Sequence, residues 1–184
     1  MLFRSASSET AVLSQAFQGA VRQDLAAYLS TRLWQAIGAE TPAFWLMNRT
    51  GVINAGGNFN ATLRDYARLG IVLANDGARP DTGAQVLPKQ YLVEATDWKQ
   101  HPPAFHPRTA TPYFGYGYQF WLFPSDKRRF ALLGVYGQLI YVDPELKLVM
   151  VQTAANATAR AGGTTLGREA DALWRGLVAH YGAW

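Results

Sequence analysis

Two glycines separated by two residues mark the part of this sequence best suited to chemistry with the main chain. They stand in the run Gly134-Val135-Tyr136-Gly137-Gln138. Because glycine has no side chain, such a run lets backbone N–H groups come close to a ligand or a reacting group, which ordinary strands avoid. A β-bulge would also use glycines in a strand, so both interpretations stay open at this point.

Two further sets of polar residues are weaker candidates. Asn58 and Asn60 lie in a Gly-rich loop, where they either line a cleft or serve the turn itself. His101 and His106 stand five residues apart in a proline-containing loop near Asp97. That spacing fits neither helical nor hairpin metal ligation. We therefore predict no metal site and no cofactor.

Composition excludes several classes of protein. The chain has 184 residues, 49% of them hydrophobic and 16% charged, as expected of a globular domain with a real core. The net charge of +4 comes from scattered arginines, which predicts a solvated surface and no nucleic-acid partner. The absence of cysteine excludes disulfides and thiolate catalysis. No apolar run is long enough to span a bilayer, so we expect no membrane partner.

The elements that position these residues follow from hydrophobic periodicity. Helical segments occupy about residues 9–97 and are interrupted near residues 19–24 and by a loop over residues 40–61. One helix starts at Thr62-Leu-Arg-Asp65, which resembles a capping box, and ends at Asn75-Asp-Gly77. On the first helix, an apolar face is expected from Val12, Leu13, Ala16, Phe17 and Ala20.

The second half reads as antiparallel strands over about residues 113–154, followed by a helix over about residues 165–181. An aromatic strand over residues 113–124 leads through a turn at residues 125–127 to a strand from Phe130. An Asp143-Pro144-Glu145 turn then joins the last two strands. The pattern predicts an α+β fold, in which helices flank an antiparallel meander, and a single partial domain over residues 1–184.

Four segments in this order resemble the C-terminal part of the penicillin-recognising serine hydrolases, above all β-lactamase-related esterases and 6-aminohexanoate-dimer hydrolases. They are residues 3–13, residues 56–70, Tyr116-Gly-Tyr-Gln-Phe-Trp121 and Gly134-Val-Tyr-Gly-Gln-Leu-Ile-Tyr-Val-Asp-Pro144. The resemblance covers nearly the whole chain and implies the C-terminal portion of a β-lactamase/transpeptidase-like fold. Complete members of that family are roughly twice as long.

The resemblance also implies roles for individual residues. The family uses a Ser nucleophile, a Lys three residues later, a Tyr from a second motif and a strand whose backbone N–H stabilises the oxyanion. The Val135 N–H takes the oxyanion position. Five residues are implied near the substrate: Gly134, Tyr136, Gly137, Gln138 and Asn58.

The nucleophile motif itself does not occur in these 184 residues. The residues three positions before the four lysines are Val86, Thr96, Pro124 and Pro144, so there is no Ser-x-x-Lys. Thr96 with Lys99 is the one hydroxyl at this spacing, and we expect it to lie at an exposed helix end. The catalytic Tyr position is held by Ser5, whose hydroxyl is shorter and less acidic than a phenol. Ser7 holds the position of the polar partner, and both serines also suit a polar terminus that caps a helix.

Three functions remain open. In the first, the chain is a fragment or truncated homologue of a serine hydrolase for amide or ester bonds and is inactive alone. In the second, it is a ligand-binding module without turnover. In the third, it is one half of a split hydrolase that another chain complements. The substrate of the parent enzyme stays open. The first residues lack the apolar core of a signal peptide, which predicts a cytoplasmic protein if Met1 is the true start.

The last predicted strand runs from Leu146 through Ala154. The resemblance further implies that the strands which pair beside it in the family are missing from this chain. Val149 and Val151 would then lie on an unpaired edge. We therefore expect the partners to be a missing N-terminal half or a second copy that associates through this strand, with Lys147 as its one gatekeeper.

Overall fold

The computed structural model describes residues 7–53, 55–159 and 165–184. The chain divides into two compact units, Leu69–Trp184 and Arg4–Arg68, each with its own packing. That the whole chain forms a single partial domain stays a prediction. Within the described ranges, no helix has both the length and the apolar character needed to cross a membrane.

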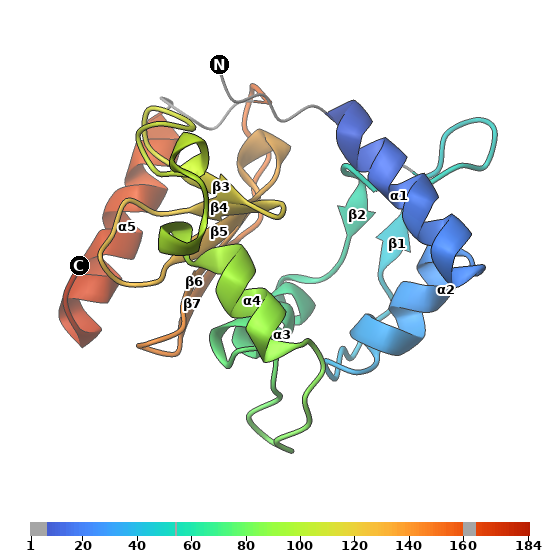
Figure 1. The fold of residues 1–184 in the computed structure, drawn as a ribbon, viewed down its shortest axis with the longest axis horizontal. Helices are drawn as coiled ribbons and strands as arrows, with labels where there is room; N and C mark the ends of the chain where they lie inside the picture. Colours follow the sequence, from blue (N-terminus) through green and yellow to red (C-terminus); the bar gives the residue numbers. More distant parts are fainter. Residues whose placement is uncertain (1–6, 54, 160–164) are drawn as a thin grey trace. The chain divides into compact units, whose positions relative to one another are not determined.

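The unit Leu69–Trp184 is built on a sheet of five antiparallel strands (Figure 1). Each strand pairs with the next one along the chain, in the order β3, β4, β5, β6, β7, which confirms the predicted meander and the α+β class. The bounds are β3 Gly115–Gly117, β4 Phe120–Leu122, β5 Phe130–Leu133, β6 Leu139–Asp143 and β7 Leu148–Gln152.

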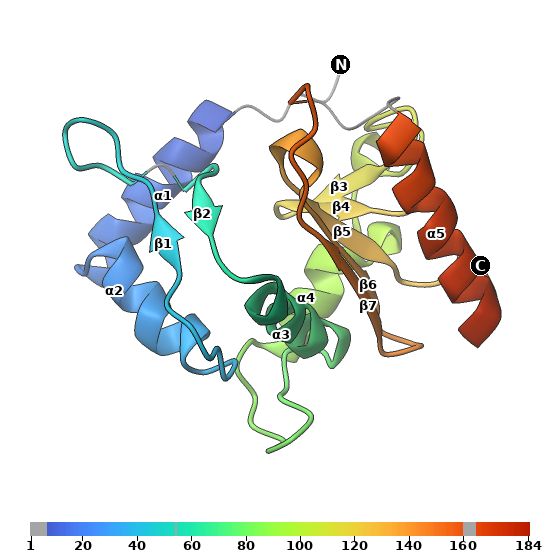
Figure 2. The ribbon, with the colours of Figure 1, turned by 180° about the vertical axis from the view of Figure 1, so that it is seen from behind.

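Helices cover both faces of this sheet. Helix α5 (Thr165–Tyr181) lies on one face, and α4 (Lys89–Thr96) lies on the other (Figure 2). Because strand side chains alternate, Tyr141 joins the α5 face, where Trp174 is fully buried. The same cluster contains Phe123, Ala131, Leu139, Ala170 and Val178. The predicted bounds of the last helix are confirmed.

The aromatic segment is two strands and not the single strand that we predicted. Tyr118 and Gln119 have φ values of 42° and 75°, so the chain turns back between β3 and β4. Two successive left-handed residues give the twist of a two-residue hairpin. The sequence signal was hidden because such turns usually contain Asn or Gly. The glycines of this segment, Gly115 and Gly117, lie in strand β3 and not in the turn. A Cβ on Gly115 would lie 2.6 Å from the carbonyl oxygen of Phe105, and one on Gly117 would lie 2.6 Å from that of Ala95.

The segment that packs against these glycines contains His101 and His106. It carries two short 3-10 helices, Trp98–Gln100 and Pro103–Phe105. The His106 Nε2 lies 2.6 Å from the carbonyl oxygen of His101, and the His101 Nε2 lies 3.4 Å from that of Ala95. The Nε2 atom of each of these two histidines faces a carbonyl oxygen, so each Nε2 donates a hydrogen bond. Within the described ranges, no three metal-binding side chains gather.

Strand β7 lies at one edge of the sheet, but Val149 does not point out from that edge. A Cβ built on Gly70 would lie 2.5 Å from the Val149 Cγ1, so the valine packs on the sheet face under α3 (Leu63–Ala74). Val149 therefore belongs to an edge strand of the described sheet, while its side chain packs against α3 and not on the open edge. The unpaired groups of an edge strand belong to its backbone, whereas side chains stand above and below the sheet. Lys147 lies in the turn before β7 and donates to the carbonyl oxygen of Ala74.

A buried arginine connects the sheet to the residues that follow α5. The Arg129 Nε donates to Asp143 at 2.5 Å, and the two side chains retain 1% and 0% of their exposure. The Arg129 Nη1 donates to Ser125 Oγ and its Nη2 to the carbonyl oxygen of Ala183. Asp143 also accepts from the backbone N–H groups of the β6–β7 turn. The charge is therefore compensated on all sides, as burial requires.

The unit Arg4–Arg68 contains α1 (Ser7–Val21), α2 (Leu25–Leu29), a π-helical turn (Ser30–Trp34) and the pair β1 (Phe44–Trp45) and β2 (Phe59–Asn60). Asp24 caps α2 by accepting from the Ala27 N–H. The apolar face predicted for α1 is not buried within the described unit, since Val12 and Leu13 are exposed and Ser14 is buried instead. The helix carries the predicted apolar stripe, but periodicity does not identify what covers such a stripe.

Candidate functional site

The Gly134–Gln138 segment is a compact turn between β5 and β6, not a strand. Val135–Gly137 form a tight turn, in which Tyr136 has φ 59° and ψ 22° and Gly137 has φ 91°. A left-handed conformation is unfavourable for Tyr but not for Gly. The alternative of a β-bulge within a strand is therefore excluded, and the glycines did mark unusual backbone.

Both glycines accommodate this protein's own side chains. A Cβ on Gly134 would lie 2.9 Å from the Gln138 Cβ, and one on Gly137 would lie 2.5 Å from the Asn156 Nδ2. The close approach that the sequence indicated is thus made within the turn. Any larger residue at these positions would displace the turn.

Hydrogen bonds from the following segment hold the left-handed Tyr136 in place. The Tyr136 N–H donates to the carbonyl oxygen of Ala159 at 3.1 Å, and the Tyr136 carbonyl accepts from Asn156 N–H at 3.0 Å. The Gly137 carbonyl accepts from the Gln152 side chain at 2.9 Å. Backbone strain of this kind persists only where its surroundings enforce it, and it is common at functional sites.

The turn leaves the Val135 N–H available. Val135 is 59% exposed, and no group in the described part of the chain accepts a hydrogen bond from its N–H. The neighbouring Tyr136 is 48% exposed. An exposed backbone donor held in a rigid turn can stabilise negative charge on an approaching oxygen. Gln138, by contrast, uses both polar atoms of its side chain on Ala154.

The other residues implied for the site belong to the unit Arg4–Arg68. Ser5 lies outside the described residues, and Ser7 is the first residue of α1. Asn58 has φ 63°, and its carbonyl accepts from the Leu46 N–H and the Asn60 side chain. Asn58 therefore serves its turn. That these residues join the Gly134–Gln138 turn at one substrate site stays a prediction.

The one hydroxyl at the nucleophile spacing is occupied elsewhere. Thr96 is buried, not exposed as we expected. Its hydroxyl donates to the carbonyl oxygen of Leu92 and accepts from Arg128. The Lys99 Nζ donates to the carbonyl oxygen of Asp126. The two groups therefore do not form a nucleophile and base.

A buried carboxylate that periodicity did not single out lies at the start of α3. Burial acts to raise the pKa of Asp65, but hydrogen bonds from the Thr41 hydroxyl, the Glu40 N–H and the Thr62 hydroxyl outweigh it. The pKa therefore lies well below its ordinary value of 3.8. Arg68 and the Thr41 N–H complete its partners. With every acceptor position engaged, Asp65 has no capacity left for proton transfer, and its role is structural.

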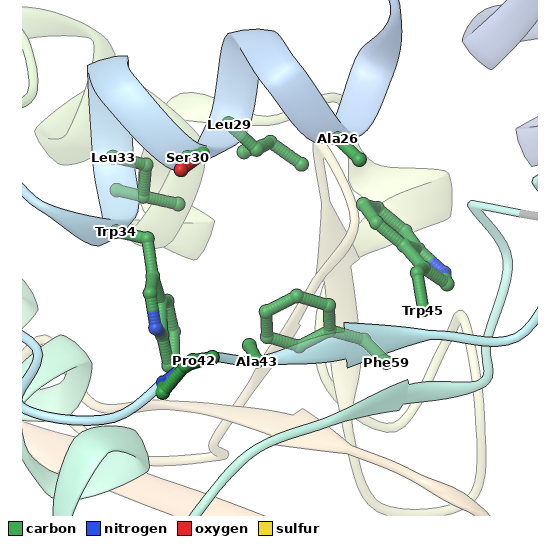
Figure 3. A pocket seen from close by; sticks show the side chains of 9 residues that line it. All are labelled: Ala26, Leu29, Ser30, Leu33, Trp34, Pro42, Ala43, Trp45 and Phe59. Carbon is green, nitrogen blue, oxygen red and sulfur yellow. The ribbon is translucent and has the colours of Figure 1, made fainter.

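A small apolar pocket lies within the same unit, between the π-helical turn and β1 (Figure 3). Its aromatic wall consists of Phe59, Trp34 and Trp45, with ring centroids 5.2 and 5.1 Å from Phe59. Both indole N–H groups donate to backbone carbonyls, those of Thr41 and Gly57. The pocket encloses about 150 Å³ and is otherwise lined by Ala26, Leu29, Ser30, Leu33, Pro42 and Ala43. Sequence reasoning missed it because its walls come from separate elements.

Comparison with known proteins places this fold. The family model Beta-lactamase matches residues 3–172. The chain belongs to the Beta-lactamase family. Among curated proteins, the 6-aminohexanoate-dimer hydrolase of Paenarthrobacter ureafaciens is 26% identical over 155 residues, which are 83% of this chain and 39% of that protein.

A solved structure agrees with the fold. A protein from Bacillus anthracis, provisionally named 6-aminohexanoate-dimer hydrolase, superposes with a TM-score of 0.81 at 28% sequence identity. The superposition covers 98% of this chain and 44% of that protein. The chain thus spans less than half the length of these two relatives. The predicted resemblance to β-lactamase-related hydrolases is confirmed.

Proposed function

We propose that this chain forms part of a β-lactamase-related serine hydrolase that acts on amide or ester bonds, and that the Ser-x-x-Lys motif lies outside these 184 residues. Family membership and the names of both relatives support the reaction class. The observation that carries the proposal is the Val135 N–H, which has no acceptor among the described residues and lies beside the left-handed Tyr136. In this role the N–H donates to the oxyanion of a tetrahedral intermediate.

The other residues of the site take complementary roles in this proposal. Gly134 and Gly137 permit the turn, and the exposed Tyr136 side chain borders the substrate. Ser5 stands where relatives carry Tyr, so it contributes no comparable proton transfer, because a hydroxyl of high pKa is a poor acid or base at neutral pH.

The isolated chain should hydrolyse neither a chromogenic short-chain ester nor a β-lactam above background. Without a nucleophile, a serine hydrolase retains only binding and oxyanion stabilisation. Spectrophotometric assays and labelling by a fluorophosphonate probe measure this directly. A product burst equal to the protein concentration, or a labelled hydroxyl, would show that the chain has a nucleophile of its own.

Replacing Val135 by proline tests the oxyanion role, because proline has no N–H, and Val135→Ala controls for the loss of the valine side chain. Gly134 has φ −110° and ψ 167°, the extended conformation that a residue before proline adopts. In an active protein that contains this chain and a Ser-x-x-Lys segment, Val135→Pro should lower kcat by about 10²–10³-fold. Val135→Ala keeps the N–H and should stay within about threefold. Equal activity of the two variants excludes the proposed role.

The pocket supports a second candidate, a non-catalytic ligand-binding module. Its volume of about 150 Å³ matches apolar cavities that hold a single benzene ring. Benzene should therefore cause saturable shifts of the Trp34 and Trp45 indole signals in NMR spectra. Ala26→Leu places a larger side chain in the pocket and should abolish these shifts. Shifts that rise linearly without saturation would exclude a binding site.

A further inference from the structure

Gln138 takes the place of a peptide group in the sheet. Strands β6 and β7 pair with Leu139 opposite Gln152, so a continued ladder would bring Gly137 opposite Ala154. Instead, the Gln138 side chain bonds both backbone groups of Ala154. Its Nε2 donates to the Ala154 carbonyl, and its Oε1 accepts from the Ala154 N–H at 3.1 Å. A carboxamide offers the same donor and acceptor pair as a peptide group.

This substitution releases the backbone of residues 135–137 from the ladder. The Gly137 carbonyl is bonded by the Gln152 side chain, and the Tyr136 carbonyl is bonded by the Asn156 N–H. The Gly134 N–H in turn donates to the Gln138 carbonyl at 2.9 Å, which closes the turn at its base. The β6–β7 pairing therefore continues through a side chain while the main chain folds outward.

The same geometry explains why glycine precedes Gln138 by four residues. The Gln138 Cβ occupies the space that a Cβ on Gly134 would fill. A side chain at position 134 would push the glutamine away from Ala154. Gly134 and Gln138 thus act as a pair.

We propose that Gln138 is the positioning residue of this turn, which keeps the Val135 N–H out of the β ladder and does not itself bind substrate. Only the use of the Val135 N–H rests on the proposed function. The positioning role concerns the conformation of the turn. It can be tested on the 184-residue chain without any assay of activity.

Amide hydrogen exchange of the chain tests this role. In Gln138→Ala, the Ala154 amide loses its acceptor and its protection factor should fall at least about tenfold, while amides of residues 148–152 stay within about twofold. The Val135 and Tyr136 amide signals should move at the same time. Gln152→Ala removes the other carboxamide that reaches the turn and should leave the Ala154 amide protected.

Gln138→Glu supplies a conservative rescue. The ionised carboxylate has no donor and faces the Ala154 carbonyl oxygen, whereas the protonated acid again presents one donor and one acceptor. Within the described part of the turn, Tyr136 is the one residue with a titratable side chain. The hydrogen-bond partners of the Gln138 side chain are all backbone groups. Lowering the pH through about 4.3 should therefore restore the wild-type positions of the Val135 and Tyr136 signals in this variant but not in Gln138→Ala.

Three results would overturn the proposal. One is an Ala154 amide that keeps its protection in Gln138→Ala. Another is a loss of protection that extends equally along β7, which would show general destabilisation. The third is a Gln138→Glu variant that behaves alike at pH values above and below the carboxyl titration. An active enzyme is not needed for any of them, so failure of the proposed function would be seen separately.

Discussion

Arg129→Ala is expected to lower the free energy of unfolding of the unit Leu69–Trp184 by about 3–5 kcal/mol, because it leaves Asp143 buried without its cation. Asp143 is fully buried, so water cannot replace the guanidinium. The variant also loses the bonds from Arg129 to Ser125 and Ala183, which join the sheet to the residues that follow α5. Urea titration followed by the amide signals of β5 and β6 measures the unfolding of this unit alone.

Arg79→Ala is the matched control for this variant. The Arg79 guanidinium also pairs with an aspartate, Asp81, but the Asp81 side chain is 59% exposed. Solvent screening makes such an exposed pair contribute little to the free energy of unfolding. If Arg129→Ala costs no more than Arg79→Ala, water reaches Asp143 and the ion pair does not hold the unit together.

Asp65→Ala is expected to destabilise the unit Arg4–Arg68 by on the order of 3 kcal/mol, because it leaves the N–H groups of Glu40 and Thr41 without their charged acceptor. It also removes the partner of the Thr62 hydroxyl at the start of α3. Thermal and urea unfolding followed by amide signals of residues 34–45 measures the loss. Asp24→Ala removes a single-bond helix cap in the same unit and should cost only about 1 kcal/mol.

The same carboxylate makes this unit sensitive to acid. The pKa of Asp65 is lower in the folded protein than its ordinary value of 3.8, so the unfolded chain binds the proton more readily. The stabilisation is therefore complete above that ordinary value and is lost as the pH falls below it towards the folded pKa. Asp65→Ala should flatten this acid limb of the stability curve. An unchanged acid limb in the variant would assign the sensitivity to other groups.

Local signals predicted the elements whose conformation is set by nearby residues. The last helix has the predicted bounds, and α3 begins after Thr62, whose hydroxyl accepts from Asp65 N–H. The capping box was only half correct. The Asp65 carboxylate reaches Glu40 and Thr41, which are 25 and 24 residues away, and no local pattern encodes such partners.

The candidate site shows the same division between local and distant causes. The sequence located the special backbone at residues 134–138 through its two glycines. It did not reveal the left-handed Tyr136, because that conformation is enforced by Asn156 and Ala159 from beyond β7. Likewise, Tyr118 and Gln119 form a hairpin turn without the residues that usually mark one.

The meander also has a consequence for the order in which the chain folds. Since every strand of the sheet pairs with its immediate successor, β3 to β7 can assemble by closing short loops, at low entropic cost. Trp174 comes later in the chain than all five strands, so during synthesis the face that carries Phe123 and Tyr141 emerges from the ribosome before its cover does. We expect the docking of α5, rather than strand pairing, to complete this unit, and the nascent sheet to be the stage at which a chaperone is most needed.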